Sequence, residues 1–404
     1  MRSLTILLAL ALAACATVPP RALDDPGVEA VVAFDLHGER GSTIRGLADP
    51  ASGRLATLDD PVRIASISKL VVAIGVMQLV EQNRLALDRD VSADLGFPLR
   101  NPAFPDRAVT LRMLLSHTAS VRDHDDQYAI PLDGSVREVM ADPRSWGTAH
   151  APGAGYFAYS NMNFPIVAAV VERATGQRFD QWMQTNVLTP MRLDACFNWA
   201  SCSGGAISRA VVLTQSGKAV KDDLHGRRPA CPVSPARDGS CDLTRWVAGA
   251  NGAMFAPQGG LRISPRDLAR VGRMLLGDGM LDGARILSPA SVATMLAPQW
   301  RFDGHDGDTE QGFFCRYGLA AQTLATPGTG CADDPAADGI PRVGHAGEAY
   351  GLRSGLWIDR AASTGIVYYR TGLAPDPAPG RSAFRAAEER LFREAMMLLD
   401  RPAR

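Results

Sequence analysis

Residues 64–80 read IASISKLVVAIGVMQLV, and this stretch decides the fold. Apolar side chains recur in it at the three- and four-residue spacing of a buried helix, and the polar run 81–84 ends the pattern. Ser66 lies close to the predicted start of the helix, and Lys69 follows three residues later. Residues i and i+3 share one face of a helix, which brings the hydroxyl and the amine within reach of each other. The neighbouring Ser68 points to a different face and is the poorer candidate.

A serine hydroxyl becomes a strong nucleophile only when a nearby base accepts its proton. The chain contains three lysines against 39 arginines, so a lysine inside an apolar helix is unusual for this sequence. Arginine keeps its proton at working pH, whereas a desolvated lysine can lose it. We therefore predict that Ser66 is a nucleophile with Lys69 as its base, and that N–H groups at the helix start stabilise developing negative charge. The competing interpretation is a helix-start serine beside a surface lysine.

A phenol and an amide occur together at residues 159–161, which read YSN and follow the turn APGAG at 151–155. Tyr159 is the predicted proton shuttle at the leaving group. Asn161 is predicted to bind the carbonyl or amide of a substrate. Taken alone, a loop tyrosine packed on the core is the more common interpretation.

Residues 345–347 read HAG and fall on a predicted late strand. Gly347 would allow a substrate backbone to approach the strand closely. His345 would line the same site and would be neutral or cationic near pH 7. An ordinary strand histidine is the alternative interpretation of this motif.

The remaining pattern predicts strands at both ends of the chain with helices between them. A hairpin around the turn 37–41 opens the domain, and three strands and an amphipathic helix close it. The fold class is therefore α+β, with an antiparallel sheet from both chain ends flanked by helices and a mainly helical insertion. The predicted strands are 28–34, 42–47, 342–347, 352–359 and 365–370, and the further helices are 111–115, 163–174, 265–276 and 383–399.

The N-terminus has the pattern of an export signal. Arg2 precedes the apolar run 4–12, which is shorter than the ~20 residues that a membrane-spanning helix needs. The following LAAC ends at Cys15 and resembles a bacterial lipobox, which implies removal of residues 1–14 and lipidation of Cys15. We expect a lipidated linker at 15–25, a single domain over 26–404, and a periplasmic protein anchored to the outer membrane of a Gram-negative bacterium.

Six cysteines remain once Cys15 is set aside, and export to an oxidising compartment makes disulfides possible. Six cysteines allow 15 connectivities, and sequential pairing is the simplest because they fall into three close pairs. Four of the six lie in a segment of about 194–245 that is rich in Gly, Ser and Pro, which we interpret as a stapled surface insertion. The predicted pairs are Cys196–Cys202, Cys231–Cys241 and Cys315–Cys331.

The motifs SxxK, YSN and HAG, in this order and on these elements, resemble those of the penicillin-binding proteins and serine β-lactamases, in particular the class C β-lactamase-like esterases and peptidases. The resemblance covers most of the chain after residue 25. It implies that Ser66 is acylated and that the backbone N–H groups of Ser66 and Glu348 form the oxyanion hole. It also implies a scaffold role for His117. Penicillin-active members usually carry Lys-Thr-Gly where this chain has HAG, which argues against efficient β-lactamase action.

Composition and missing motifs exclude several classes of function. The net charge of −1 provides no basic field for nucleic acid, so we expect a small ester, amide or peptide as substrate and the membrane only through the lipid anchor. The chain lacks the GxSxG of an α/β-hydrolase and the HExxH of a metallohydrolase, and no metal or cofactor is implied. The open alternatives are a β-lactamase or D-Ala-D-Ala carboxypeptidase and a penicillin sensor that does not turn over. The sequence predicts no particular oligomeric state.

Overall fold

An antiparallel sheet of eight strands forms the centre of the computed structural model, which describes residues 27–400. The strand order is β12-β13-β14-β15-β16-β17-β1-β2. The strands are β1 (Glu29–Asp35), β2 (Glu39–Arg45), β12 (Trp300–Arg301), β13 (Arg316–Tyr317), β14 (Gln322–Thr323), β15 (Val343–Ala349), β16 (Leu352–Asp359) and β17 (Thr364–Arg370).

The two ends of the chain meet in this sheet, because β1 pairs with β17 from Glu29↔Arg370 to Asp35↔Thr364. This confirms the α+β fold with a sheet built from both ends. The hairpin between β1 and β2 is tighter than predicted, since β2 starts at Glu39, inside the expected turn 37–41. The Asp35 carboxylate accepts hydrogen bonds from the N–H groups of His37 and Gly38, and this local ring shortens the turn.

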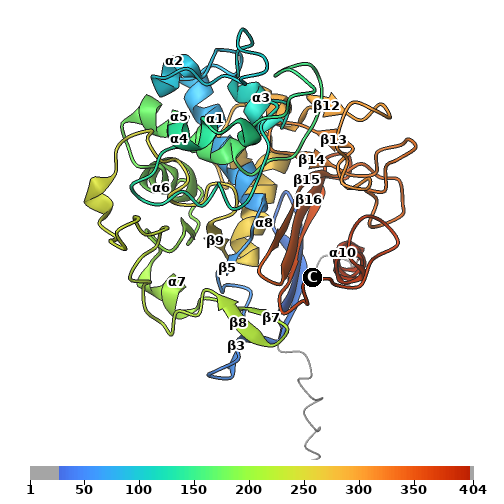
Figure 1. Ribbon diagram of the computed structural model, residues 1–404. Helices are drawn as coiled ribbons and strands as arrows, with labels where there is room; N and C mark the ends of the chain where they lie inside the picture. The colour runs from blue at the N-terminus through green and yellow to red at the C-terminus, as the bar shows by residue number, and fades with distance from the viewer. Residues whose placement is uncertain (1–26, 401–404) are drawn as a thin grey trace, which may run out of the picture.

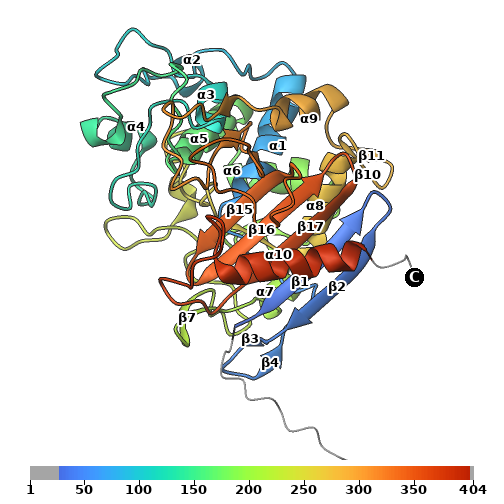
Figure 2. The same ribbon diagram turned by 90° about the vertical axis from the view of Figure 1, so that its right-hand side faces the viewer.

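Helices cover both faces of the sheet (Figures 1 and 2). The helix α10 (Ala386–Leu399) lies across one face, over β1 and β17. On the opposite face, α8 (Pro265–Leu276) packs on β1, β16 and β17, while α1 (Ile67–Glu81) packs on β15 and β16. The helix α1 starts later than residue 64, because residues 65 and 66 form the turn that leads into it.

Two helices in the region beyond α1 match predicted ones, whereas several short helices were not predicted from the sequence. The predicted helix at 111–115 is α3, and the one at 163–174 is α5, which ends at Gly176 in the left-handed conformation with φ of 69°. The further helices here and near the insertion are α2 (Ser92–Leu95), α3 (Leu111–Leu115), α4 (Val136–Met140), α5 (Asn163–Thr175), α6 (Phe179–Met183), α7 (Gly204–Ser208) and α9 (Pro289–Leu296).

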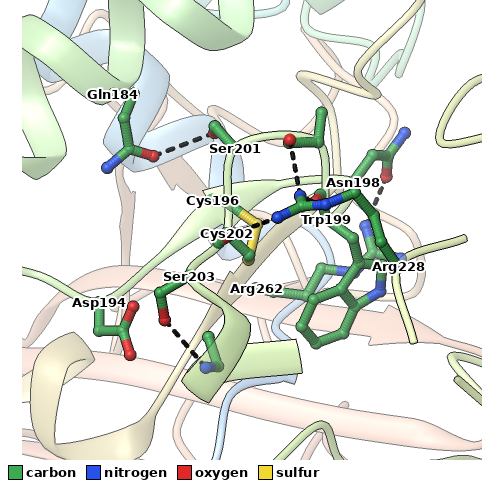
Figure 3. The surroundings of a disulfide bond; sticks show 12 residues. Gln184, Asp194, Cys196, Asn198, Trp199, Ser201, Cys202, Ser203, Arg228 and Arg262 are labelled. Carbon is green, nitrogen blue, oxygen red and sulfur yellow. Dashed lines mark hydrogen bonds between the residues drawn. A yellow bond between two sulfur atoms is a disulfide. The ribbon is translucent and has the colours of Figure 1, made fainter. Parts of the chain in front are cut away.

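Two short sheets involve the insertion at about 194–245: one connects it to the rest of the domain, and the other lies within it. In the first, β9 (Leu261–Ile263) pairs with both β5 (Val62–Arg63) and β6 (Cys196–Phe197). The second is the hairpin of β7 (Leu213–Gln215) and β8 (Lys218–Lys221). The disulfides form the three sequential pairs that the spacing predicts: Cys196–Cys202, Cys231–Cys241 and Cys315–Cys331. Figure 3 shows the first of them beside Trp199 and Arg262.

The lipidation site Cys15 and the signal peptide predicted for residues 1–14 lie outside the described residues and stay predictions. None of the helices within residues 27–400 has both the length and the apolar character that crossing a bilayer requires.

The contact between α8 and the sheet depends on a glycine. A Cβ at Gly272 would lie 2.3 Å from the ring of the fully buried Phe34. We expect Gly272→Ala to lower the free energy of unfolding by ~1–3 kcal/mol, because overpacking outweighs the gain in helix propensity. The matched control is Gly204→Ala at the start of α7, where a Cβ would meet nothing within 4 Å. Equal stability of the two variants by urea denaturation would contradict this packing argument.

Candidate active site

Ser66 is presented by a turn between β5 and α1. Ala65 adopts φ of 50°, a left-handed conformation that is uncommon for a residue with a side chain, and Ser66 is the N-cap of α1. The N–H groups of Ser68 and Lys69 in the first turn donate to the Ala65 and Ser66 carbonyls at 2.9 and 3.0 Å, which leaves the Ser66 N–H as the candidate donor to a bound oxyanion. The strained turn thus places the Ser66 hydroxyl and the Ser66 N–H together.

Lys69 is fully buried, and its amine contacts three oxygen atoms. The Nζ atom lies 2.9 Å from Ser66 Oγ, 2.8 Å from Asn161 Oδ1 and 2.8 Å from the main-chain oxygen of Gln258. Carbonyl oxygens only accept hydrogen bonds, so the two N–H bonds of a neutral amine are directed to Asn161 and Gln258. The remaining lone pair then faces the Ser66 hydroxyl, as a general base requires.

The surroundings of Lys69 favour its neutral form. Burial lowers the pKa of Lys69 to about 7, against the opposing effect of Asp123 and Glu310. A large fraction of the amine is therefore neutral near pH 7. The alternative of a surface lysine beside a helix-start serine is wrong, because the side chain has no exposure to solvent. Ser68 has a structural role, since its Oγ donates to the Ala65 carbonyl and accepts from the Leu261 N–H.

Tyr159 lies beside this pair. Its ring centroid is 4.9 Å from Lys69 Nζ, and the ring is stacked between His117 and Phe314 at 4.3 and 4.7 Å. Burial raises the pKa of Tyr159 well above its usual value, and the neighbouring Ser66 hydroxyl opposes the shift. The phenol consequently keeps its proton at neutral pH and is suited to donate it. His117 holds this segment, because its Nδ1 accepts a hydrogen bond from the Ser160 N–H.

Asp123 fixes the YSN segment and was not singled out from the sequence. Its carboxylate accepts hydrogen bonds from Ser160 Oγ and from the N–H groups of Asn161 and Met162. It also accepts one from Asn161 Nδ2 at 3.0 Å. Both ends of the Asn161 amide therefore have protein partners, and this residue positions Lys69 as well as lining the cavity. A carboxylate 36 residues before Tyr159, in a loop without periodicity, gives no sequence signal for this role.

His345 is on β15 as predicted, and it is buried and paired with Tyr317. Its Nε2 lies 2.8 Å from the Tyr317 hydroxyl, and its Nδ1 lies 2.5 Å from the Ala346 carbonyl. Burial, with the nearby Lys69, lowers the pKa of His345 to about 3. Of the two charge states expected from the sequence, the structure supports the neutral one. The sequence analysis missed Tyr317, which lies on a two-residue strand.

The role expected for Gly347 needs correction. A Cβ at this position would lie 2.3 Å from the Ile64 carbonyl oxygen and 2.4 Å from Ser354 Oγ. The close approach that glycine permits is therefore made by the chain just before Ser66, and not by a substrate backbone. This contact brings the start of α1 against β15.

A cavity of about 640 Å³ opens at these residues, and we call it the active-site cavity. All the catalytic and substrate-binding residues that the sequence predicts line this cavity except Lys69, which is fully buried. Within residues 27–400, no cluster of His, Cys, Asp and Glu has an arrangement that could hold a metal ion. The residues that line the cavity include Ser66, Asp123, Tyr159, Asn161, Glu310, Phe314, His345, Gly347 and Glu348.

Comparison with known proteins places this site in a family. The sequence profile of the Beta-lactamase family matches residues 21–390, which is most of the chain. The chain belongs to the Beta-lactamase family. Curated relatives include esterase EstB from Burkholderia gladioli, 33% identical over 190 residues, covering 42% of this chain and 46% of the relative. Penicillin-binding protein 4 from Amycolatopsis lactamdurans is 29% identical over 276 residues, covering 66% and 64%. These matches span about half to two thirds of the relatives' lengths.

Several solved structures share the fold of this chain. A penicillin-binding protein homologue from Pyrococcus abyssi superposes with a TM-score of 0.65 at 17% identity, covering 93% of this chain and 74% of its own. The D-amino acid amidase from Ochrobactrum anthropi SV3 gives a TM-score of 0.63 at 18% identity, covering 93% and 94%. At such identity the likeness supports the β-lactamase/transpeptidase-like fold and no particular substrate.

The state of Lys69 can be tested by pH. Only the neutral amine can accept the Ser66 proton, so the rate of covalent labelling by a fluorophosphonate should rise with pH through about 7 and then level off. Because the pKa of Tyr159 is strongly raised, no second ionisation of the phenol is expected at mildly alkaline pH. The measurement is the second-order labelling rate between about pH 5.5 and 8.5. A flat profile over this range would show that Lys69 is not the base.

Proposed function

We propose that this protein is a serine hydrolase that cleaves an ester or amide through an acyl-enzyme. The observation that carries the proposal is the buried contact of 2.9 Å between Ser66 Oγ and Lys69 Nζ, with both remaining directions of the amine occupied by carbonyl oxygens. The Beta-lactamase family and the esterase relative support the same class of reaction.

In the acylation step Ser66 Oγ attacks the substrate carbonyl carbon while its proton passes to Lys69 Nζ. The carbonyl oxygen becomes an oxyanion, for which the N–H groups of Ser66 and Glu348 are the proposed donors, and both residues line the active-site cavity. The bond to the leaving alcohol or amine then breaks, and Tyr159 supplies the proton. Tyr159 regains a proton from Lys69, so the pair returns to its starting state.

Deacylation reverses these roles. Water attacks the acyl carbon, its proton passes to the same pair, and the Ser66 oxygen leaves as a hydroxyl. The products are a carboxylic acid and the alcohol or amine, and no redox partner or cofactor takes part in these steps.

Esters or simple amides fit the site better than β-lactams. Where penicillin-active members carry a lysine, His345 is neutral and its Nε2 is occupied by Tyr317. That part of the wall therefore offers no cation to the carboxylate of a β-lactam. A substrate panel of short p-nitrophenyl esters, D-alanyl peptides and nitrocefin would rank these classes, and we expect esters first.

The exported, lipid-anchored location proposed from Cys15 would be tested by labelling with a radioactive fatty acid.

Removal of either member of the central pair should abolish or cripple turnover. Ser66→Ala should lose both fluorophosphonate labelling and p-nitrophenyl acetate hydrolysis. Lys69→Arg keeps the charge but cannot accept a proton, and should lower kcat at least ~100-fold. Lys218→Arg, at an exposed position in β8, is the control and should match the unaltered protein. A burst of p-nitrophenol without steady-state turnover in the unaltered protein would favour a sensor over an enzyme.

Tyr159 should matter for the leaving group more than for substrate binding. Tyr159→Phe keeps the ring stacking with His117 and Phe314 but removes the proton donor, so kcat should fall ~100-fold or more while KM changes little. The loss should be larger for an amide than for a p-nitrophenyl ester, because an amine needs a proton to leave. Tyr156→Phe, whose ring stacks on His150 outside the active-site cavity, serves as the control. Equal kcat for Tyr159→Phe and Tyr156→Phe would contradict the shuttle role.

A further inference from the structure

A second cavity of about 490 Å³ lies between the insertion, β5 and the loop that carries Gln258. Arg63, Lys221, Gln258 and Tyr350 are among the residues that line it. Gln258 connects it to the reacting centre, because its main-chain oxygen accepts the 2.8 Å hydrogen bond from Lys69 Nζ. Arg63 comes three residues before Ser66. The second cavity therefore adjoins the catalytic pair from the side of Gln258.

Arg63 is a buried cation that packs on an aromatic ring and has no ion-pair partner within residues 27–400. Its residue is only 7% exposed, and its guanidinium makes no hydrogen bond or ion pair with any of residues 27–400. The guanidinium carbon lies 5.1 Å from the centroid of the Tyr350 ring. Burial, and the nearby Arg262, lower the pKa of Arg63 to about 10, which still leaves it charged at neutral pH. A buried charge without a counter-ion is costly and calls for a ligand that supplies one.

Asp222 raises the pKa of Arg63 through space, but no carboxylate within residues 27–400 makes an ion pair with Arg63. Arg63 lies directly opposite Arg262 in the pairing of β5 with β9. Asp222 is committed to Arg262, which it contacts at 2.7 and 3.1 Å, and it also accepts from Trp199 Nε1 at 2.8 Å. Figure 3 shows Arg262 beside Trp199 under the disulfide of the insertion. The only other carboxylate lining the second cavity is the exposed Asp223.

A second cation faces the same aromatic ring. Lys221 Nζ lies 5.6 Å from the centroid of Tyr350, and no ion pair joins it to any of residues 27–400. Tyr350 is 43% exposed, so it stands where the second cavity meets solvent. The side-chain oxygen of Gln258 is buried without a hydrogen-bond partner, so its amide is free to turn and present an N–H. The buried Arg63, the exposed Lys221 and an amide that can donate together form a site for an anion.

We propose that the second cavity binds a carboxylate carried by the acyl portion of the substrate, with Arg63 as its main ligand. The inference rests on the proposed function, and it names the substrate class of that site: esters or amides of a dicarboxylic or similar acid. With the leaving group beside Tyr159, as the proposed function has it, the acyl portion would extend toward Gln258, whose main-chain oxygen contacts Lys69 and which lines the second cavity. A carboxylate there would pair with Arg63 while the scissile carbonyl lies at Ser66.

The kinetic test compares p-nitrophenyl monoesters of adipic, suberic and sebacic acid with their methyl-capped, neutral counterparts. We expect the unaltered protein to prefer at least one free acid over its methyl ester, by about tenfold or more in kcat/KM. Arg63→Gln should remove this preference, and Arg63→Lys should retain part of it. Arg227→Gln takes one positive charge from the same insertion at an exposed position outside the second cavity, and should keep the preference. Equal preference in Arg63→Gln and the unaltered protein would overturn the proposal.

A binding measurement separates this inference from the proposed function. Calorimetric titration of the Ser66→Ala protein with adipate, and with neutral 1,6-hexanediol as control, does not depend on turnover. Adipate binding that is lost in Ser66→Ala/Arg63→Gln supports the anion site even if no ester is hydrolysed. Adipate binding without any preference among the esters would overturn the assignment to the substrate, because the second cavity would then hold a free anion. Hydrolysis of neutral esters with no adipate binding would overturn this inference alone.

Discussion

The structure depends on one constraint: an amine must be kept out of water within 2.9 Å of a serine hydroxyl. Burying Lys69 is unfavourable for its charged form, and that penalty is what makes the neutral form available near pH 7. The geometry needs three separate segments, namely α1, the loop that carries Asn161 and the loop that carries Gln258. The three segments together exclude solvent from the Lys69 amine. The fold thereby keeps a large fraction of this amine in its neutral form near pH 7.

The sequence was sufficient for the parts of this arrangement that are local or periodic. The i, i+3 relation of Ser66 and Lys69 follows from helix geometry, and the late strands follow from their alternation and turns. Asp123, Gln258 and Tyr317 could not be found in this way. Each acts through a contact with a segment far away in the chain, and none lies in a periodic pattern. Gly347 shows a subtler limit: the sequence indicated a close approach, but only the structure identifies the Ile64 carbonyl as the group that approaches.

The insertion supplies charged residues near Arg63 in addition to covering this side of the domain. The β7–β8 hairpin ends with Lys221, and the next residue, Asp222, forms an ion pair with Arg262. Because β5 and β9 place Arg63 and Arg262 opposite each other, one carboxylate has to serve two guanidiniums. Asp222 uses both oxygens on Arg262 and shares one with Trp199, so Arg63 makes no ion pair within residues 27–400 and is influenced by Asp222 only through space. The imbalance follows from strand register, and it lies on the chain that leads directly to Ser66.

The distribution of charge around Ser66 and Lys69 then favours one orientation of a charged substrate. On β15, His345 is neutral and closed off by Tyr317, so that wall attracts no anion. On the other side of Lys69, beyond Gln258, two cations remain unpaired. A substrate whose acyl end carries a carboxylate would pair with Arg63 in one orientation, whereas the reverse orientation would place that carboxylate in the active-site cavity, where Arg353 and Arg385 are already paired with Glu348 and Asp376. Exchanging a cation on β15 for one on β5 would change which end of a substrate is held, while leaving Ser66 and Lys69, the proposed nucleophile and base, in place.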